Sequence, residues 1–282
     1  MMTIDSHCHF LDPQAISYCW MTPDMPLARR LMPEDLLPLQ QQHGIEGAIL
    51  VEAADSYEEN RFMFEQADRH DAIVGVVPWI DMEADNFRQR LSRCQEHPKF
   101  VGIRAMIEMI PDDQWMLGPA VQESFGVLEE DDICFDFLVR PGHLPHVIKV
   151  LETFPKLRAV IDHMAKPPIR DGALHPWKDL MAKVGSYENV HCKVSGMITE
   201  ADLEIWRPED LSPFIEHVLA IFGVERLMFG SDWPVCLLAG SFGDVVAALR
   251  QNLVDLPDRQ IAQVFGETAQ RFYRIPRSRI SP

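Results

Sequence analysis

The sequence has no excess of positive charge and no long apolar segment. Its 282 residues include 26 basic and 43 acidic side chains, for a formal net charge of −17, which opposes attraction to nucleic acid or to an anionic membrane. No uninterrupted apolar run approaches the roughly 20 residues that cross a bilayer, and no basic start followed by an apolar stretch marks a signal peptide. We therefore expect a cytoplasmic protein whose partner is a small molecule, with neither nucleic acid nor a membrane as partner.

The six cysteines include no Cys-x-x-Cys pair. This absence argues against a structural zinc knuckle and against a thioredoxin-like redox centre. Cys8 stands between two histidines, and on a strand its side chain would leave on the face opposite theirs. We interpret Cys8 as a packing residue, and we expect the cysteines to be reduced and mostly buried.

Apolar segments alternate along the chain with amphipathic segments of helical length, a pattern typical of a parallel sheet covered by helices. No Gly-x-Gly-x-x-Gly or phosphate loop follows the first apolar segment. The main sequence feature that would indicate a nucleotide-binding open sheet is therefore missing. The pattern predicts an α/β fold, a single-domain (β/α)8 TIM barrel over residues 1–276 with a C-terminal helix at 258–273 packed on it and a frayed tail at 277–282. The predicted strands are residues 4–10, 47–53, 73–79, 100–106, 133–139, 157–162, 190–195 and 226–231. The predicted helices include residues 33–43, 57–70, 84–94, 144–153, 177–184, 208–222 and 242–253.

A histidine pair and an aspartate lie near opposite ends of the chain. His7 and His9 stand two residues apart on the first predicted strand, so their side chains leave on one face and can converge on a metal ion or a substrate. Asp232 closes a Gly-Ser-Asp sequence after the last predicted strand. Because first and last strands are neighbours in a closed barrel, we expect the two motifs to meet at the C-terminal mouth, where barrel enzymes hold their active sites.

Other polar and aromatic residues stand at or near the ends of the predicted strands. We expect His163 to join the catalytic group, and we expect the long connections at residues 11–32 and 108–119 to form rims or lids over the pocket. Arg140 precedes Pro-Gly and is interpreted as a solvated side chain. The predicted substrate-binding residues are Arg104, Lys193, Trp79 and Trp233, with Glu52 as a further possible pocket wall.

Five short motifs stand in order at these strand ends: IDSHCH at residues 4–9, VGIR at 101–104, IDHMAKP at 161–167, CKVSG at 192–196 and GSDWPV at 230–235. With them the chain resembles, over essentially its whole length, the amidohydrolase superfamily, and within it the amidohydrolase-2 branch that includes sugar-lactone and pyrone-dicarboxylate lactonases. The resemblance implies a hydrolase that opens the ring of a sugar-derived aldonolactone, such as L-fucono- or L-rhamnonolactone.

The chain departs from the binuclear members of that superfamily at two strand ends. Those members place a bridging lysine or glutamate on strand four and a metal-binding histidine on strand five, where this sequence has Arg104 and Arg140. Arginine is not a metal ligand at ordinary pH, but its fork of donors can hold a carboxylate, a carbonyl or sugar hydroxyls. We therefore expect no two-metal centre and an oxygen-rich substrate.

The resemblance also implies roles for the strand-end residues. Asp232 would act as general base, taking a proton from the water that attacks the lactone carbonyl and returning it to the ring oxygen. One Zn²⁺ or other divalent ion could stabilise the carbonyl oxygen, with His7, His9, His163 and Asp232 as its candidate ligands, or the histidines could do so directly in a metal-free site. The same residues suit either arrangement, and the sequence leaves both open.

Several alternatives remain open at the level of sequence. A 2-pyrone-4,6-dicarboxylate lactonase ranks second among lactonases, because the 108–119 connection is acidic and polar where a dicarboxylate would need cations. A mononuclear zinc decarboxylase of an aromatic or unsaturated acid would share the barrel, the histidine pair and the final aspartate. A non-catalytic metabolite-binding barrel ranks below both. The exact lactone and the choice between monomer and homodimer stay undecided.

Overall fold

Eight parallel strands form the centre of the fold in the computed structural model, which describes residues 2–276 and 279. Each strand pairs with its neighbour in the sequence, within one sheet of order β1-β2-β3 and another of order β4-β5-β6-β7-β8. Most side chains of the strands are buried, as expected for a parallel sheet covered by helices. The strands are β1 (Ile4–Cys8), β2 (Gly47–Val51), β3 (Ile73–Val77), β4 (Ile103–Ala105), β5 (Phe135–Phe137), β6 (Ala159–Ile161), β7 (Val190–Val194) and β8 (Leu227–Phe229).

Single parallel bridges join the two sheets into a closed ring. Trp79 pairs with Arg104 beyond the end of β3, and Cys8 of β1 pairs with Trp233 beyond the end of β8. At the second junction the backbone N–H of His9 donates to the Trp233 carbonyl at 2.7 Å, and the N–H of Asp232 donates to the His7 carbonyl at 2.9 Å. The ring confirms the predicted (β/α)8 barrel and makes the first and last strands neighbours.

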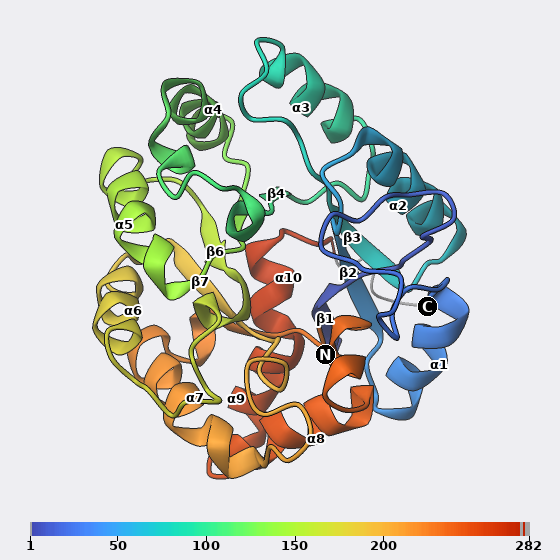
Figure 1. Cartoon of the computed structure of the whole chain (residues 1–282), viewed down its shortest axis with the longest axis vertical. Helices are drawn as coiled ribbons and strands as arrows, with labels where there is room; N and C mark the ends of the chain where they lie inside the picture. The colour runs from blue at the N-terminus through green and yellow to red at the C-terminus, as the bar shows by residue number, and fades with distance from the viewer. Residues whose placement is uncertain (1, 277–278, 280–282) are drawn as a thin grey trace.

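The helices surround the strands as an outer layer (Figure 1). Their starts follow local chemistry: Ser56 caps one helix by accepting from the Glu59 N–H at 3.1 Å, and Pro119 opens another at a position that needs no N–H donor. This second helix was not among the predicted ones. The helices are α1 (Pro33–Gln42), α2 (Tyr57–Arg69), α3 (Phe87–Gln95), α4 (Pro119–Glu130), α5 (Leu144–Thr153), α6 (Trp177–Gly185), α7 (Pro208–Phe222), α8 (Phe242–Asn252), α9 (Asp258–Ala262) and α10 (Thr268–Phe272).

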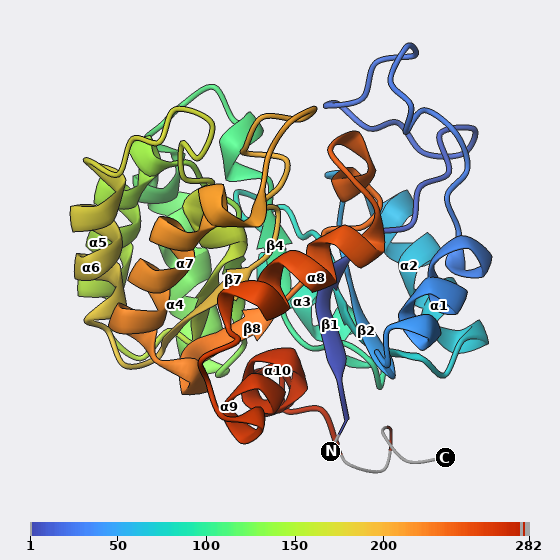
Figure 2. The same cartoon turned by 90° about the horizontal axis from the view of Figure 1, so that it is seen from below.

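The C-terminal helices pack on the end of the barrel at which the strands begin. Figure 2 shows α9 and α10 beside the start of β1, and the connection at residues 11–32 at the opposite end of the barrel. A Cβ atom on Gly266 would lie 2.1 Å from the Met2 carbonyl oxygen, so the glycine permits this close approach. The helix predicted at 258–273 is thus present, interrupted by a π-helical turn between α9 and α10. The tail predicted at 277–282 lies outside the described residues, except for Arg279.

Two buried apolar clusters account for the core. The larger one lies between the strands and the helices, and the smaller one joins strand side chains such as Ile49 and Val160 to Phe272 and Tyr273 at the C-terminal end. Within the described ranges, the helices include none whose length and apolar character would suit a membrane crossing. The rigid ring therefore presents its strand ends, with their short polar loops, as one face on which a site can be built.

Candidate functional site

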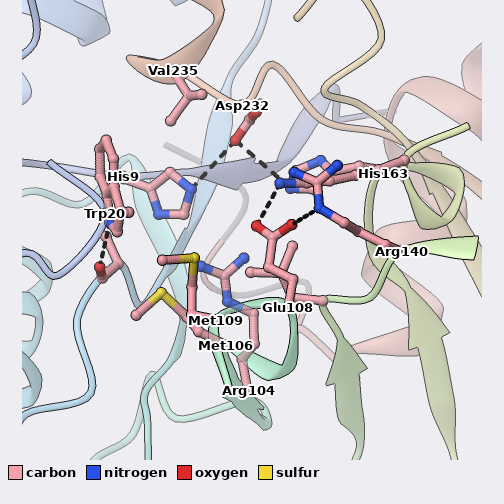
Figure 3. Close-up of a pocket in the computed structure, with 13 residues that line it drawn as sticks. His9, Trp20, Arg104, Met106, Glu108, Met109, Arg140, His163, Asp232 and Val235 are labelled. Atoms are coloured by element: carbon pink, nitrogen blue, oxygen red, sulfur yellow. Dashed lines mark hydrogen bonds and ion pairs between the residues drawn. The ribbon is translucent and has the colours of Figure 1, made fainter. Parts of the chain in front are cut away.

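The four predicted catalytic residues meet at the carboxyl ends of β1, β6 and β8. The Nε2 atoms of His7 and His9 are 3.2 Å apart. The Asp232 Oδ1 atom lies 3.4 Å from His9 Nε2 and 3.8 Å from the Nε2 atoms of both His7 and His163. All four side chains are buried. Figure 3 shows Asp232 between His9 and His163, so residues that are 225 positions apart in the sequence form one group.

Two of these residues occupy the left-handed backbone region, with φ of 52° at His163 and 55° at Asp232. Non-glycine residues persist there only when their surroundings hold them, and such positions cluster at functional sites. Two glycines make the room: a Cβ on Gly196 would stand 2.8 Å from the His163 ring, and a Cβ on Gly230 would stand 2.7 Å from the His7 Cβ. The glycines of the CKVSG and GSDWPV motifs thus allow the strand ends to come close together.

The imidazoles of His7 and His163 are held in the neutral form. Burial lowers the pKa of His163 to about 4, and burial followed by the Lys193 charge holds the pKa of His7 well below its usual range. The His9 Nδ1 atom lies 2.8 Å from the Val51 carbonyl oxygen, which can only accept, so Nδ1 carries a proton and, in the neutral ring, Nε2 presents its lone pair. Burial opposes ionisation of Asp232, but its polar neighbours, His163 first among them, outweigh burial and hold the Asp232 pKa below its usual range.

One group of these residues fits a divalent ion. The lone pair of His9 and the Asp232 carboxylate are two acceptors that face each other, an arrangement that a cation between them would stabilise. In a tetrahedral zinc site the ligand atoms stand about 3.3–3.6 Å apart, close to the 3.2, 3.4 and 3.8 Å separations among His7, His9 and Asp232. These three residues therefore form a candidate site for one ion.

A second group of possible ligands, His7 with Asp162 and His163, does not fit an ion in the same way. The Lys193 ammonium lies 3.0 Å from His7 Nδ1 and 3.0 Å from Asp162 Oδ1. It also contacts Asp136 Oδ2 at 2.6 Å. A protein cation is thus already bound to two of these three side chains, His7 and Asp162.

A cavity of about 300 Å³ opens over the group. Its polar wall includes Glu108, whose Oε1 accepts from Lys166 Nζ at 2.5 Å and whose Oε2 lies 3.2 Å from Arg140 Nε. Trp20, from the 11–32 connection, donates from Nε1 to the Ala53 carbonyl at 2.8 Å and forms another wall. The lining residues are His9, Trp20, Ala53, Arg104, Met106, Glu108, Met109, Leu138, Arg140, His163, Lys166, Asp232 and Val235.

Part of this lining is not among the residues predicted from the sequence. The sequence predicts a solvated Arg140. The side chain is indeed exposed, but it also forms part of the cavity wall, where it faces Glu108 and its Nη1 lies 3.7 Å from Glu200 Oε2. Lys166 stands inside the IDHMAKP motif, a signal that could have identified it. Trp20 and Met109 reach the cavity because of the way the long connections fold. Neither residue belongs to a sequence motif that could have identified it.

The predicted substrate-binding residues separate into two sets. Arg104 lines the cavity, although it is only 3 % exposed and its Nε donates to the Glu52 carboxylate at 2.8 Å. Glu52, which accepts this hydrogen bond from Arg104, is itself completely buried beneath the cavity. Trp79 lines a neighbouring cavity that shares Met106 and Met109 with the first.

The other two predicted contacts are displaced from the cavity. Lys193 is 0 % exposed because its side chain points into the ring of strands beneath His7, where Asp136 and Asp162 hold it. Trp233 is 1 % exposed and packs edge-on against Phe10, with ring centroids 6.2 Å apart. Lys193 therefore contacts His7 from inside the ring of strands, and Trp233 belongs to the core.

Comparisons with known proteins agree with this geometry. The amidohydrolase-2 family model, described as Amidohydrolase, matches residues 4–275. The chain is 36% identical to an L-fucono-1,5-lactonase of Burkholderia ambifaria, over 97% of this chain and 96% of that protein. It is 32% identical to an L-fucono-1,5-lactonase of Burkholderia multivorans, over 98% and 97%. A crystal structure of an amidohydrolase from Burkholderia multivorans with bound zinc superposes with a TM-score of 0.93 at 30% identity, covering 98% of this chain and 100% of that one. The chain therefore belongs to the amidohydrolase-2 family, as its five sequence motifs indicated.

Proposed function

We propose that the protein hydrolyses a sugar-derived aldonolactone, with L-fucono-1,5-lactone as the first candidate substrate. The observation that carries the proposal is the nearly full-length likeness to two L-fucono-1,5-lactonases, at 36% and 32% identity. The buried group of His7, His9, His163 and Asp232 supports it, because opening a lactone needs a base for water and a donor or cation for the carbonyl oxygen.

In this proposal Asp232 is the general base. Its pKa lies below the usual range, so the carboxylate is ionised and able to accept a proton at neutral pH. Water attacks the lactone carbonyl carbon while Asp232 takes one of its protons. The bond between that carbon and the ring oxygen then breaks, and Asp232 returns the proton to the departing oxygen. The balance is one water added, and the product is an open-chain hydroxy acid.

In the same proposal His163 stabilises the oxygen that becomes anionic. Its Nδ1 lies 2.8 Å from the Ser195 hydroxyl, which can donate to Nδ1 and leave the proton on Nε2, the atom that faces Asp232 in the cavity. A preorganised N–H aimed at developing charge lowers the barrier more than one that must reorient. A zinc ion held by His7, His9 and Asp232 would supply Lewis-acid polarisation of the same carbonyl.

The charge balance of the cavity favours a neutral, hydroxyl-rich substrate over a dicarboxylate. The two cations of the outer wall, Arg140 and Lys166, already face carboxylates of Glu108 and Glu200. A dicarboxylate would have to compete with those carboxylates for both cations. Sugar hydroxyls both donate and accept, so they can hydrogen-bond to either partner of such pairs.

A pH-indicator assay over a panel of substrates tests the proposal, because hydrolysis of a lactone releases a proton. The panel contains L-fucono-1,5-lactone, an L-rhamnonolactone and 2-pyrone-4,6-dicarboxylate, each with added Zn²⁺ and with a chelator. We expect acceleration over spontaneous hydrolysis for the sugar lactones and little for the pyrone. Turnover of the pyrone alone, or release of carbon dioxide from an aromatic acid with no lactone hydrolysis, would overturn the proposal.

A further inference from the structure

Each ring nitrogen of His7 faces a side chain that is permanently positive. Lys193 Nζ lies 3.0 Å from Nδ1, and Arg104 Nη1 lies 3.2 Å from Nε2. Carboxylates fix both cations: Asp162 contacts Lys193 at 3.0 Å and Arg104 at 3.2 Å, and Glu52 accepts from Arg104 at 2.8 Å. All of these side chains are buried, so the two cations have little freedom to move away.

A neutral imidazole has one N–H and one lone pair, so it cannot accept from both cations at once. If Lys193 donates to Nδ1, the proton of His7 stands on Nε2. That proton can point at His9 Nε2, 3.2 Å away, whose lone pair is free because Nδ1 of His9 donates to the Val51 carbonyl. These contacts form one continuous donor-to-acceptor chain from Lys193 through His7 to His9. In this tautomer Nε2 of His7 has no lone pair for a metal ion, and its N–H faces the Arg104 guanidinium at 3.2 Å as donor against donor.

The other tautomer meets a different obstacle. With its proton on Nδ1, His7 would present an N–H to the Lys193 ammonium at 3.0 Å, and only the more distant Asp162 Oδ1, at 3.5 Å, could accept from it. The Nε2 lone pair would then be shared between an incoming ion and the N–H of Arg104. The guanidinium charge would also repel a divalent ion at close range in a buried site.

We propose that Arg104 and Lys193 act as built-in cations that lower the affinity of the His7, His9 and Asp232 group for a divalent metal ion. The inference concerns the same site as the proposed function, but metal affinity is measured without substrate. A failure of the metal-affinity proposal can therefore be distinguished from a failure of the proposed lactonase function. The chain keeps a donor set that fits one ion and, beside it, two cations that oppose the binding of that ion.

The test is a zinc titration of the full-length protein in competition with a chromophoric chelator. Arg104→Gln removes the competing cation, and we expect the dissociation constant for Zn²⁺ to fall at least about tenfold, in the range found for residues that support metal ligands. The double variant Glu52→Gln with Arg104→Gln removes one positive and one negative charge together. An equal gain in zinc affinity in the double variant assigns the effect to the contact between Arg104 and His7 rather than to net charge. The double variant also avoids leaving the Glu52 carboxylate buried without a partner.

Arg140→Gln is the matched control, because Arg140 lines the same cavity without a contact to His7. We expect its zinc affinity to stay close to that of the unmodified protein. Folded Arg104 variants that bind zinc no more tightly than the unmodified protein, or an equal gain from Arg140→Gln, would overturn the proposal.

A second measurement needs no variant. The ¹⁵N chemical shifts of the His7 ring in metal-free protein report which nitrogen carries the proton, and we expect the proton on Nε2. A proton on Nδ1 would remove Lys193 from the proposal.

Discussion

At the scale of single residues, the outer wall of the cavity depends on one carboxylate shared by two cations. Burial opposes the ionisation of Glu108, but Lys166 and then Arg140 outweigh it and lower the Glu108 pKa. Glu108→Gln leaves both cations less compensated, so the carboxylate of the hydroxy-acid product should bind more strongly. We expect the inhibition constant of the product to fall about tenfold, the equivalent of one charge-assisted hydrogen bond.

Product-inhibition kinetics with the hydroxy acid check this expectation. Glu200→Gln is the control, because Glu200 lies farther from Arg140, at 3.7 Å, and should change inhibition less. Inhibition by the acid that stays the same in Glu108→Gln would show that the pair does not set the charge preference of the cavity.

The sequence indicated the central residues of the site, but the directions of several side chains needed the structure. His7 and His9 follow from strand alternation, and Asp232 follows from its motif. Lys193 lies within β7 and turns into the ring, whereas a residue beyond the strand end would reach the mouth. At Asp232 the backbone leaves the strand geometry with φ of 55°, so alternation no longer places Trp233, which turns into the core.

At the scale of elements, the site depends on how closely β8 approaches β1 and β7. A Cβ on Gly230 would stand 2.7 Å from the His7 Cβ and 3.0 Å from the Ser195 Cβ. Gly230→Ala must push these strand ends apart, and such overpacking costs about 1–3 kcal/mol of unfolding free energy. We also expect a marked loss of kcat, because His7 would shift.

Gly142→Ala serves as the matched control for denaturant unfolding and kinetics, since nothing stands within 4 Å of a Cβ added there. It should leave both the stability and the turnover unchanged. If Gly230→Ala behaves like Gly142→Ala, close contact between these strand ends is not a requirement of the site.

The predicted strands all appear, but β4, β5, β6 and β8 are only three residues long. Each apolar segment continues past the last paired residue of its strand, because the loop that follows is buried as well. Apolar character alone does not distinguish a buried strand from a buried loop. The predicted loop at 108–119 overlaps two short 3-10 turns, at Ile107–Met109 and Trp115–Leu117, before α4 begins. Such turns depend on packing more than on periodicity, which explains why they could not be predicted.

At the scale of the whole molecule, the C-terminal helices close the end of the barrel opposite the site. The Tyr273 hydroxyl donates to Asp136 Oδ2 at 2.7 Å, and Asp136 in turn contacts Lys193 below His7. Tyr273→Phe removes a buried hydrogen bond to a carboxylate, so we expect the free energy of unfolding to fall by about 1–3 kcal/mol.

Turnover should change little in Tyr273→Phe, because Lys193 keeps its contacts with Asp136 and Asp162. Denaturant unfolding and steady-state kinetics on one preparation measure both quantities. A protein that keeps its full stability would show that this contact contributes nothing to closing the barrel.

The closed ring itself could be predicted, since eight alternating units in a chain of this length favour one architecture. The pairing of the charged side chains inside the ring could not be predicted. Glu52, Asp136, Asp162, Arg104 and Lys193 come from five different strands or strand ends, and only the closed barrel brings them together beneath the histidines.

If Asp232 is the base that activates water for opening a sugar lactone, replacing its carboxylate should remove most of the activity. The most direct measurement compares the hydrolysis of L-fucono-1,5-lactone by the unmodified protein and by Asp232→Asn, with circular dichroism to establish that both are folded. We expect rapid ring opening by the unmodified protein and a kcat lower by about 10²–10⁴-fold in the variant, the usual contribution of a positioned base. A folded Asp232→Asn protein that hydrolyses the lactone at the unmodified rate would contradict the role of Asp232 as the base.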